Sequence, residues 1–408
     1  MSRPAPGVWL RVSALGAATG TAVVVATGEW GRSHQAAVLG TLALTIVVAV
    51  AALLAHRDRP VFVGFALTAL AMFGLQVLLG GLVALTDAAW PAGLHVAFGA
   101  LSLAASALTC ALAFRDTSLH VGRVPWRDYL ALTKPRIMTL LLLTALGGLF
   151  VGQRGVPSLG LVLATLGGLA LACGGASALN HVLDADIDRH MRRTDRRPVA
   201  TGRVAPERAL EFGLALSAFS FVVLTSFVNL VAALLAVFGN LFYVLVYTKY
   251  LKRTTPQNIV IGGAAGAIPP VVGYSAATGN LALPALFLFL IVFVWTPPHF
   301  WALALLIRRD YEAAKVPMLP VVRGEHRTAI EIVRYTVALV AITVLPVVTG
   351  ELGWLYLGAA VTLGAAFLWL ALSLLLETTA ARAKRVFSYS LAYLALLFVV
   401  MAIDPIVL

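Results

Sequence analysis

Residues 158–188 read SLGLVLATLGGLALACGGASALNHVLDADID. The stretch is apolar over most of its length, and a helix needs about 20 such residues to cross a lipid bilayer. It closes on Asn180, Asp184 and Asp188, spaced four residues apart. At about 100° per residue, each step of four advances only about 40° around a helix. The pattern therefore predicts a membrane helix that ends in one amide and two carboxylates on a single face.

The rest of the chain has the same apolar character. Hydrophobic residues make up 60% of the 408 residues and charged residues 12%, with a mean hydropathy of +0.92. Soluble proteins carry about twice that share of charge. We therefore expect an all-α integral membrane protein with about 13 spanning helices. They are expected at residues 9–26, 36–55, 61–85, 92–113, 137–152, 158–182, 209–226, 229–248, 257–277, 283–304, 328–349, 353–376 and 386–403.

The basic residues fall in alternate loops between these spans. With a cytoplasmic N-terminus, the outer loops hold only Arg32 and Arg154, and the other loop cations lie inside, for example in runs at 115–136, 189–208 and 308–334. Cytoplasmic loops are enriched in Lys and Arg. This predicts a multi-pass cell-membrane protein with a cytoplasmic N-terminus and an external C-terminus. Because the net charge of +12 lies in these short loops, it does not indicate a nucleic-acid partner.

One inner segment divides the chain. Residues 116–136 contain Gly122, Pro125 and several basic residues between two sets of spans. We expect a four-helix membrane region at 1–115, a cytoplasmic connecting segment at 116–136 and a nine-helix bundle at 137–408.

The row of Asn180, Asp184 and Asp188 suggests a metal site. Charges at membrane depth usually face a cavity or a partner. Oxygen ligands of this kind suit Mg²⁺, which commonly bridges to substrate phosphates. The alternative is a solvated loop start, with carboxylates neutralised by neighbouring arginines. The basic residues that follow favour phosphate handling, since Arg is a good phosphate donor and a poor metal ligand; they are Arg192, Arg193, Arg196 and Arg197.

Three further polar segments lie on the same predicted face. They are TKPR at 133–136, YTKYLKRTTPQN at 247–258, and WTPPHFW at 295–301 with RRDYEAAKVPMLP at 308–320. Carboxylates for a metal beside Lys and Arg for phosphate are the groups needed to bind a diphosphate. The apolar bundle offers room for a lipid-like tail.

These motifs resemble the membrane-embedded prenyltransferase superfamily (UbiA type), and more narrowly its protoheme IX farnesyltransferase (haem O synthase) branch. The segments that carry the resemblance are LTKPR at 132–136, ALNxxxDxDID at 178–188, RRP at 196–198, TGR at 201–203, YTxxLKRxTPQN at 247–258, GAAGAIPP at 263–270, and WTPPHFW at 295–301 through DYxxAxxPMLP at 310–320. The wider superfamily usually has a second Asp-x-x-x-Asp motif. Here Ala314 stands four residues after Asp310, as in the haem branch.

The resemblance implies transfer of a farnesyl group from farnesyl diphosphate to a vinyl group of haem B, giving haem O on the cytoplasmic side. It implies that Asn180, Asp184, Asp188 and Asp310 hold Mg²⁺, and that these residues and Lys249 are catalytic. The residues implied to bind the diphosphate are Arg136, Arg192, Arg193, Lys252 and Arg253. A haem A synthase or a terminal-oxidase assembly factor is an expected partner in the lipid membrane.

His299 is a candidate haem contact, as is His181, and the alternative for each is a hydrogen-bonded structural residue. Two other functions remain open. The first is prenyl transfer to an aromatic quinone or chlorin precursor, which the PPHFW and PMLP segments disfavour. The second is a non-catalytic haem-binding module, which has no need of a row of carboxylates beside basic residues.

The first four expected helices contain an imperfect repeat. SHQAAVLGTLA at 33–43 and GLHVAFGALS at 93–102 place His34 and His95 at the start of two inward-running helices. Histidines at one depth on two helices suit bis-histidine haem ligation, and the alternative is two interfacial histidines without a ligand. The segment LQVLLGGLV at 75–83, followed by His95, resembles one half of the haem A synthase family. The resemblance implies a retained haem-binding half near the external face.

Overall fold

The computed structural model describes residues 8–27, 32–85, 99, 101–103, 105–110, 112–113 and 124–407, and these residues form helices and loops without a strand. The N-terminal part contains α1 (Val8–Thr27), α2 (Arg32–Ala55) and α3 (Pro60–Leu85). The larger part contains the long helices α6 (Pro135–Gln153), α7 (Leu159–Leu183), α9 (Pro206–Phe227), α12 (Asn258–Thr278), α13 (Leu283–Leu306), α16 (Glu325–Val348), α17 (Trp354–Leu376) and α18 (Ala380–Val407). One further long helix is composite, made of α10 (Leu230–Leu241), the π-helix η1 (Phe242–Leu251) and α11 (Lys252–Thr254).

Eleven of the thirteen expected membrane helices are confirmed in the described residues. In the described residues, 11 helices are long and apolar enough to cross a membrane, and each overlaps one of the predicted spans. Nine of these lie between residues 135 and 407, which matches the predicted nine-helix bundle. The predicted span at 9–26 coincides with α1. Of the predicted span at 92–113, the structure describes residues 99, 101–103, 105–110 and 112–113.

Small residues let the central helices approach closely. A methyl group added at Gly148 of α6 would collide with the carbonyl of Pro270 in α12, and one at Gly273 would collide with the carbonyl of Ala145. Helices in lipid gain their association from such close packing, because lipid supplies little hydrophobic driving force. Glycines at these contacts therefore hold α6 and α12 together at the centre of the bundle.

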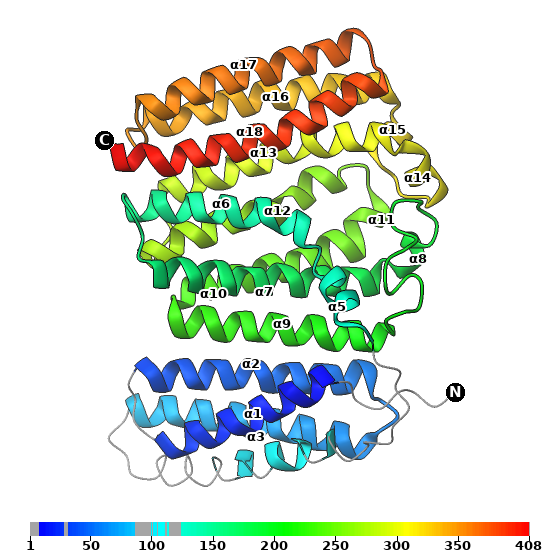
Figure 1. Ribbon diagram of the computed structural model, residues 1–408. Coiled ribbons are helices and arrows are strands. Elements are labelled where there is room, and N and C mark those ends of the chain that lie inside the picture. Colours follow the sequence, from blue (N-terminus) through cyan, green and yellow to red (C-terminus); the bar gives the residue numbers. More distant parts are fainter. Residues whose placement is uncertain are drawn as a thin grey trace.

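Short helices gather toward one end of the long ones (Figure 1). They are α5 (Trp126–Leu132), α8 (Ala185–Asp188), α11, α14 (Arg308–Ala313) and α15 (Leu319–Val322). Each lies within, or next to, one of the polar segments singled out in the sequence. The fold therefore brings polar segments that are far apart in the sequence to one end of an apolar bundle.

The N-terminal helices pack against the larger part through α2 and α9 (Figure 1). At the end of α2, His56 Nε2 lies 2.8 Å from Glu211 Oε1 of α9, with both side chains 1% exposed. Trp9 of α1 packs on Phe212 of α9, with ring centroids 4.8 Å apart. The connecting segment predicted at 116–136 contains α5, whose Tyr129 ring contacts both of these rings, 5.1 Å from Phe212 and 6.0 Å from Trp9.

Candidate active site

The carboxylate row lies where α7 ends. Asn180, Asp184 and Asp188 are 3%, 1% and 2% exposed. Asp184 joins α7 to α8, and the backbone N–H groups of Asp184 and Asp188 still bond to the carbonyls four residues back, at 2.9 and 2.8 Å. The four-residue spacing therefore keeps its helical geometry across the junction. The Asn180 Nδ2 donates to Asp184 Oδ2 at 2.8 Å and to Thr248 Oγ1 at 3.1 Å.

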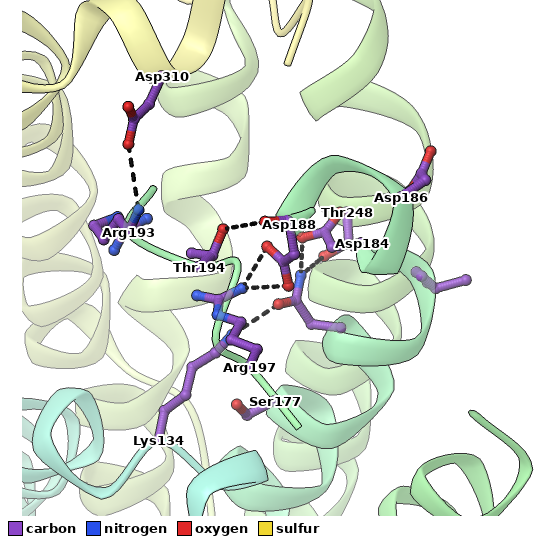
Figure 2. Close-up of polar contacts among 12 residues, drawn as sticks. Lys134, Ser177, Asp184, Asp186, Asp188, Arg193, Thr194, Arg197, Thr248 and Asp310 are labelled. Carbon is purple, nitrogen blue, oxygen red and sulfur yellow. Dashed lines mark hydrogen bonds and ion pairs between the residues drawn. The ribbon is translucent and has the colours of Figure 1, made fainter. Parts of the chain in front are cut away.

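A cation from a different segment binds each member of the row, and Figure 2 shows two of these cations, Lys134 and Arg197. Lys134, at the start of α6, donates to Asn180 Oδ1 at 2.7 Å. Lys252, in α11, donates to Asp184 Oδ2 at 2.6 Å.

In the loop after α8, Arg197 donates one Nη1 to both oxygens of Asp188 at 2.8 Å. Charge-assisted contacts to buried carboxylates are among the stronger hydrogen bonds in proteins. Lysine and arginine side chains therefore hold the amide and the two carboxylates of the row in place.

A fourth cation lies at the rim. Arg253 donates to the two oxygens of Asp186 at 2.7 and 2.8 Å and to the carbonyl of Leu183 at 2.6 Å. These hydrogen bonds lower the pKa of Asp186 to about 2. At Lys134, burial and the nearby Arg197 cation hold the pKa well below its ordinary value. The two ends of the cluster therefore differ, with an exposed ion pair at the rim and a partly buried lysine inside.

The donor set fits Mg²⁺. Asp184 Oδ1 is buried without a hydrogen-bond partner in the described part of the chain, and Arg253 Nη2 lies 3.9 Å from it. Among the described residues, no group of three or more His, Cys, Asp or Glu side chains converges. Mg²⁺ usually takes one or two carboxylates and completes its shell with water and substrate phosphates. Asp184 and Asp188, with the Asn180 amide oxygen, meet that requirement.

The predicted fourth ligand, Asp310, does not join this row. It belongs to α14, and its Oδ2 accepts the backbone N–H of Arg193 at 3.4 Å. Figure 2 shows Asp310 separated from Asp184 and Asp188 by the loop that carries Arg193 and Thr194. The structure therefore links Asp310 to the site through this loop, and its role as a fourth metal ligand stays a prediction.

Three other predicted residues lie apart from the carboxylates. The side chains of Lys249, Arg136 and Arg192 are exposed and form no hydrogen bond or ion pair with the described part of the chain. Lys249 and Thr248 are adjacent in η1, yet Thr248 is fully buried against Asn180. The site face of η1 therefore carries Thr248 and is followed by Lys252, and Lys249 lies elsewhere.

The sequence indicated no role for Lys134 or Thr248 individually, and it indicated Arg197 only as one of four arginines suited to phosphate. Lys134 precedes Pro135, the first residue of α6, and has φ +50°. Proline favours the first turn of a helix, so the TKPR motif carried a signal that Lys134 marks the helix entrance. Arg197 belongs to the predicted run of arginines, and nothing in the run distinguishes it from its neighbours.

The two candidate haem-contact histidines, His299 and His181, are both buried. His299 is 7% exposed, its Nδ1 lies 2.7 Å from Ser390 Oγ, and its ring stacks on Trp295 at 4.4 Å and on Phe387 at 4.9 Å. This favours the structural alternative for His299 over a haem contact. His181 is 1% exposed, and neither ring nitrogen has a hydrogen-bond partner among the described residues.

The predicted haem ligands of the N-terminal region are not placed. The helix that carries His34 is described, but its side chain is not, and His95 lies outside the described residues.

Comparison with known proteins identifies the family of the chain. The UbiA prenyltransferase family model matches residues 141–398. A protoheme IX farnesyltransferase from Roseiflexus sp. (strain RS-1) is 44% identical over 98% of this chain and 76% of its own length. One from Symbiobacterium thermophilum is 53% identical over 70% of this chain and 96% of its own length.

The fold has a solved counterpart. The structure of a digeranylgeranylglyceryl phosphate synthase, 20% identical in sequence, covers 69% of this chain and 99% of its own with a TM-score of 0.59. This likeness concerns the fold, and the sequence relatives supply the narrower assignment. The chain belongs to the UbiA prenyltransferase family, in its protoheme IX farnesyltransferase branch.

Proposed function

We propose that the chain transfers the farnesyl group of farnesyl diphosphate to a vinyl group of haem B, giving haem O and diphosphate. The observation that carries the proposal is the buried row of Asn180, Asp184 and Asp188 with Lys134, Arg197 and Lys252 bound to it. Relatives named protoheme IX farnesyltransferase at 44% and 53% identity support the choice of substrates.

The charges match a diphosphate leaving group. Four cations surround three carboxylates, namely Lys134, Arg197, Lys252 and Arg253 around Asp184, Asp186 and Asp188. Mg²⁺ held by Asn180, Asp184 and Asp188 would supply the further positive charge that neutralises the leaving diphosphate. Lysine and arginine donors that are already oriented stabilise the charge that grows as the allylic carbon–oxygen bond breaks.

The remaining chemistry belongs to the substrates. The farnesyl carbon, freed of diphosphate, forms a carbon–carbon bond with the electron-rich vinyl group. The cation that results on the former vinyl carbon takes the oxygen of a water molecule and releases a proton. The sum is haem B, farnesyl diphosphate and water giving haem O, diphosphate and a proton, and no covalent enzyme intermediate is needed.

The membrane setting follows the charge pattern. We propose that the site lies on the cytoplasmic side of the cell membrane, with the N-terminus inside and the C-terminus outside. The carboxylate cluster is at the end of the bundle where α8, α11, α14 and α15 gather (Figure 1), and their segments carry most loop cations. Haem O made there is available to a haem A synthase or an oxidase assembly factor in the same membrane.

The purified full-length protein tests the proposal directly. We expect incubation with farnesyl diphosphate, haem B and Mg²⁺ to give haem O, identified by mass as haem B plus a farnesyl group and a hydroxyl. Removal of Mg²⁺ with a chelator should stop product formation, and its return should restore it. Prenylation of an aromatic quinone precursor in place of haem B would contradict the acceptor assignment.

A further inference from the structure

A polar cavity is lined by residues that lie close in sequence to the site segments. None of its lining residues belongs to the carboxylate row. Its volume is about 210 Å³, and it is lined by Pro256, Gln257, Trp301, Leu319, Arg323, Arg327, Glu331 and Tyr335. Pro256 and Gln257 follow α11, which carries Lys252, and Leu319 begins α15, in the loop region after Asp310. We refer to this cavity as the arginine pocket.

The charge of the arginine pocket is positive and only partly balanced. Glu331 is its one carboxylate, and Glu331 Oε1 already binds Arg327 Nη2 at 2.8 Å and Arg334 Nη1 at 3.1 Å. The side chain of Arg323 is exposed and binds no acceptor in the described part of the chain. The pocket therefore offers one unpaired guanidinium and a second one shared with Glu331, a combination that favours an anion.

A buried donor adds to this. Trp301 is 2% exposed, and its Nε1–H has no hydrogen-bond partner among the described residues. A buried indole N–H normally finds an acceptor, so an unpaired one calls for an explanation. The Trp301 ring lies edge-on to Tyr335, with centroids 5.3 Å apart, so the wall of the pocket is rigid and aromatic.

An apolar layer, formed by one hydrophobic cluster, borders the arginine pocket and includes residues close in sequence to Asp188. Trp301 and Leu319 of the pocket belong to the same hydrophobic cluster as Ile187 and Met191, which lie beside Asp188 in the sequence. A ligand with one polar edge and a large apolar body suits a polar pocket next to such a layer. The volume of the cavity, about 210 Å³, suits the short acidic side chains of such a ligand and is too small for a large ring system.

We infer that the arginine pocket binds the carboxylates of the acceptor, the two propionate side chains of haem B. The inference rests on the proposed function. It adds that the arginine pocket is the part of the enzyme that recognises the acidic groups of the acceptor. Haem B carries its propionates on two adjacent pyrrole rings and its vinyl groups on the other two. Acids held at Arg323 and Arg327 therefore direct the vinyl edge away from the arginine pocket.

Kinetics with two acceptors test this. The full-length wild type, Arg323→Ala/Arg327→Ala and Arg334→Ala are compared with farnesyl diphosphate, Mg²⁺ and either haem B or its dimethyl ester, which lacks the acidic charges. Arg334→Ala is the matched control, because Arg334 binds the same Glu331 but does not line the pocket. Thermal unfolding of each variant checks that the fold is retained.

For the double variant we expect the KM for haem B to rise at least about tenfold, the ratio that corresponds to one lost charge-assisted hydrogen bond. The KM for the dimethyl ester should be unchanged, and Arg334→Ala should resemble the wild type with both acceptors. Trp301→Phe, which removes only the N–H and part of the ring, should also raise the KM for haem B alone.

Three outcomes overturn the inference. An unchanged KM for haem B in the double variant removes the role of the pocket. An equal rise with both acceptors shows that the arginines act on the fold and not on acidic groups. A defect seen only in bilayers that contain anionic lipid, and equal for both acceptors, assigns the pocket to a lipid phosphate. A wild type that makes no haem O from haem B overturns the proposed function itself.

Discussion

Two lysines three residues apart, Lys249 and Lys252, allow a matched test of the active site. Lys252 Nζ lies 2.6 Å from Oδ2 of Asp184, whose carboxylate is 1% exposed. Removing one oriented donor from such a site typically lowers kcat about 10²–10³-fold, or about 2.7–4 kcal/mol. Because Arg253 Nη2 lies 3.9 Å from the other oxygen of Asp184, it replaces part of the lost charge. We therefore expect Lys252→Ala to lower kcat about a hundredfold, toward the smaller end of that range.

Lys249→Ala is the control for this experiment. Its side chain is exposed and makes no hydrogen bond or ion pair with the carboxylates, so its removal should leave kcat close to the wild-type value. Lys252→Arg keeps the charge with different geometry and should fall between the two. The assay is haem O formation at saturating farnesyl diphosphate and haem B, with thermal unfolding of each variant measured in parallel. Equal losses in Lys249→Ala and Lys252→Ala would refute the assignment of Lys252 to the site.

Three further outcomes are expected. Asp184→Asn should abolish haem O formation at ordinary Mg²⁺ concentration while the protein remains folded, and near wild-type turnover would remove Asp184 from the metal site. His56→Ala should lower the free energy of unfolding by about 3–5 kcal/mol, because it leaves Glu211 buried without its partner. In denaturant titrations His56→Phe/Glu211→Leu should recover most of that loss, and a double variant as unstable as the single one would argue against the pair. Titration of the full-length protein with haem B should show a low-spin bis-imidazole spectrum that His95→Ala loses while haem O formation continues, and a spectrum unchanged by His95→Ala would exclude this ligand.

The fold could be predicted well because a long apolar segment is enough to identify a membrane helix. Length and hydropathy identified each of the nine helices after residue 135, since backbone in lipid must pair its own polar groups. The buried row was equally accessible, because a spacing of four residues fixes a common helix face. Asn180, Asp184 and Asp188 are buried side by side at one helix end, as that argument requires.

Choosing among the cations was harder. Positive charge at one end of the helices suits both membrane orientation and phosphate binding, so composition alone does not separate the two roles. Lys252 and Lys249 stand three residues apart, and only the first contacts a carboxylate. Lys134 and Arg136 flank one proline, and again only the first contacts the row. Which member of each pair points inward depends on how a helix begins or winds locally, which hydropathy does not report.

The π-helix η1 limits where the chain can lose a residue and still keep the active site. Over Phe242–Leu251 the chain follows a π-helix, and the N–H of Lys252 bonds to the carbonyl of Tyr247, five residues back. Deleting one residue there would let the segment relax to ordinary α-helical bonding, with the same composition and the same ability to cross a membrane. Each residue beyond the deletion would then change its height along the helix and the direction in which its side chain points. Lys252 would then no longer lie beside Asp184. A related sequence that lacks one residue of this ten-residue segment would therefore still insert in a membrane but would lose this contact of the site.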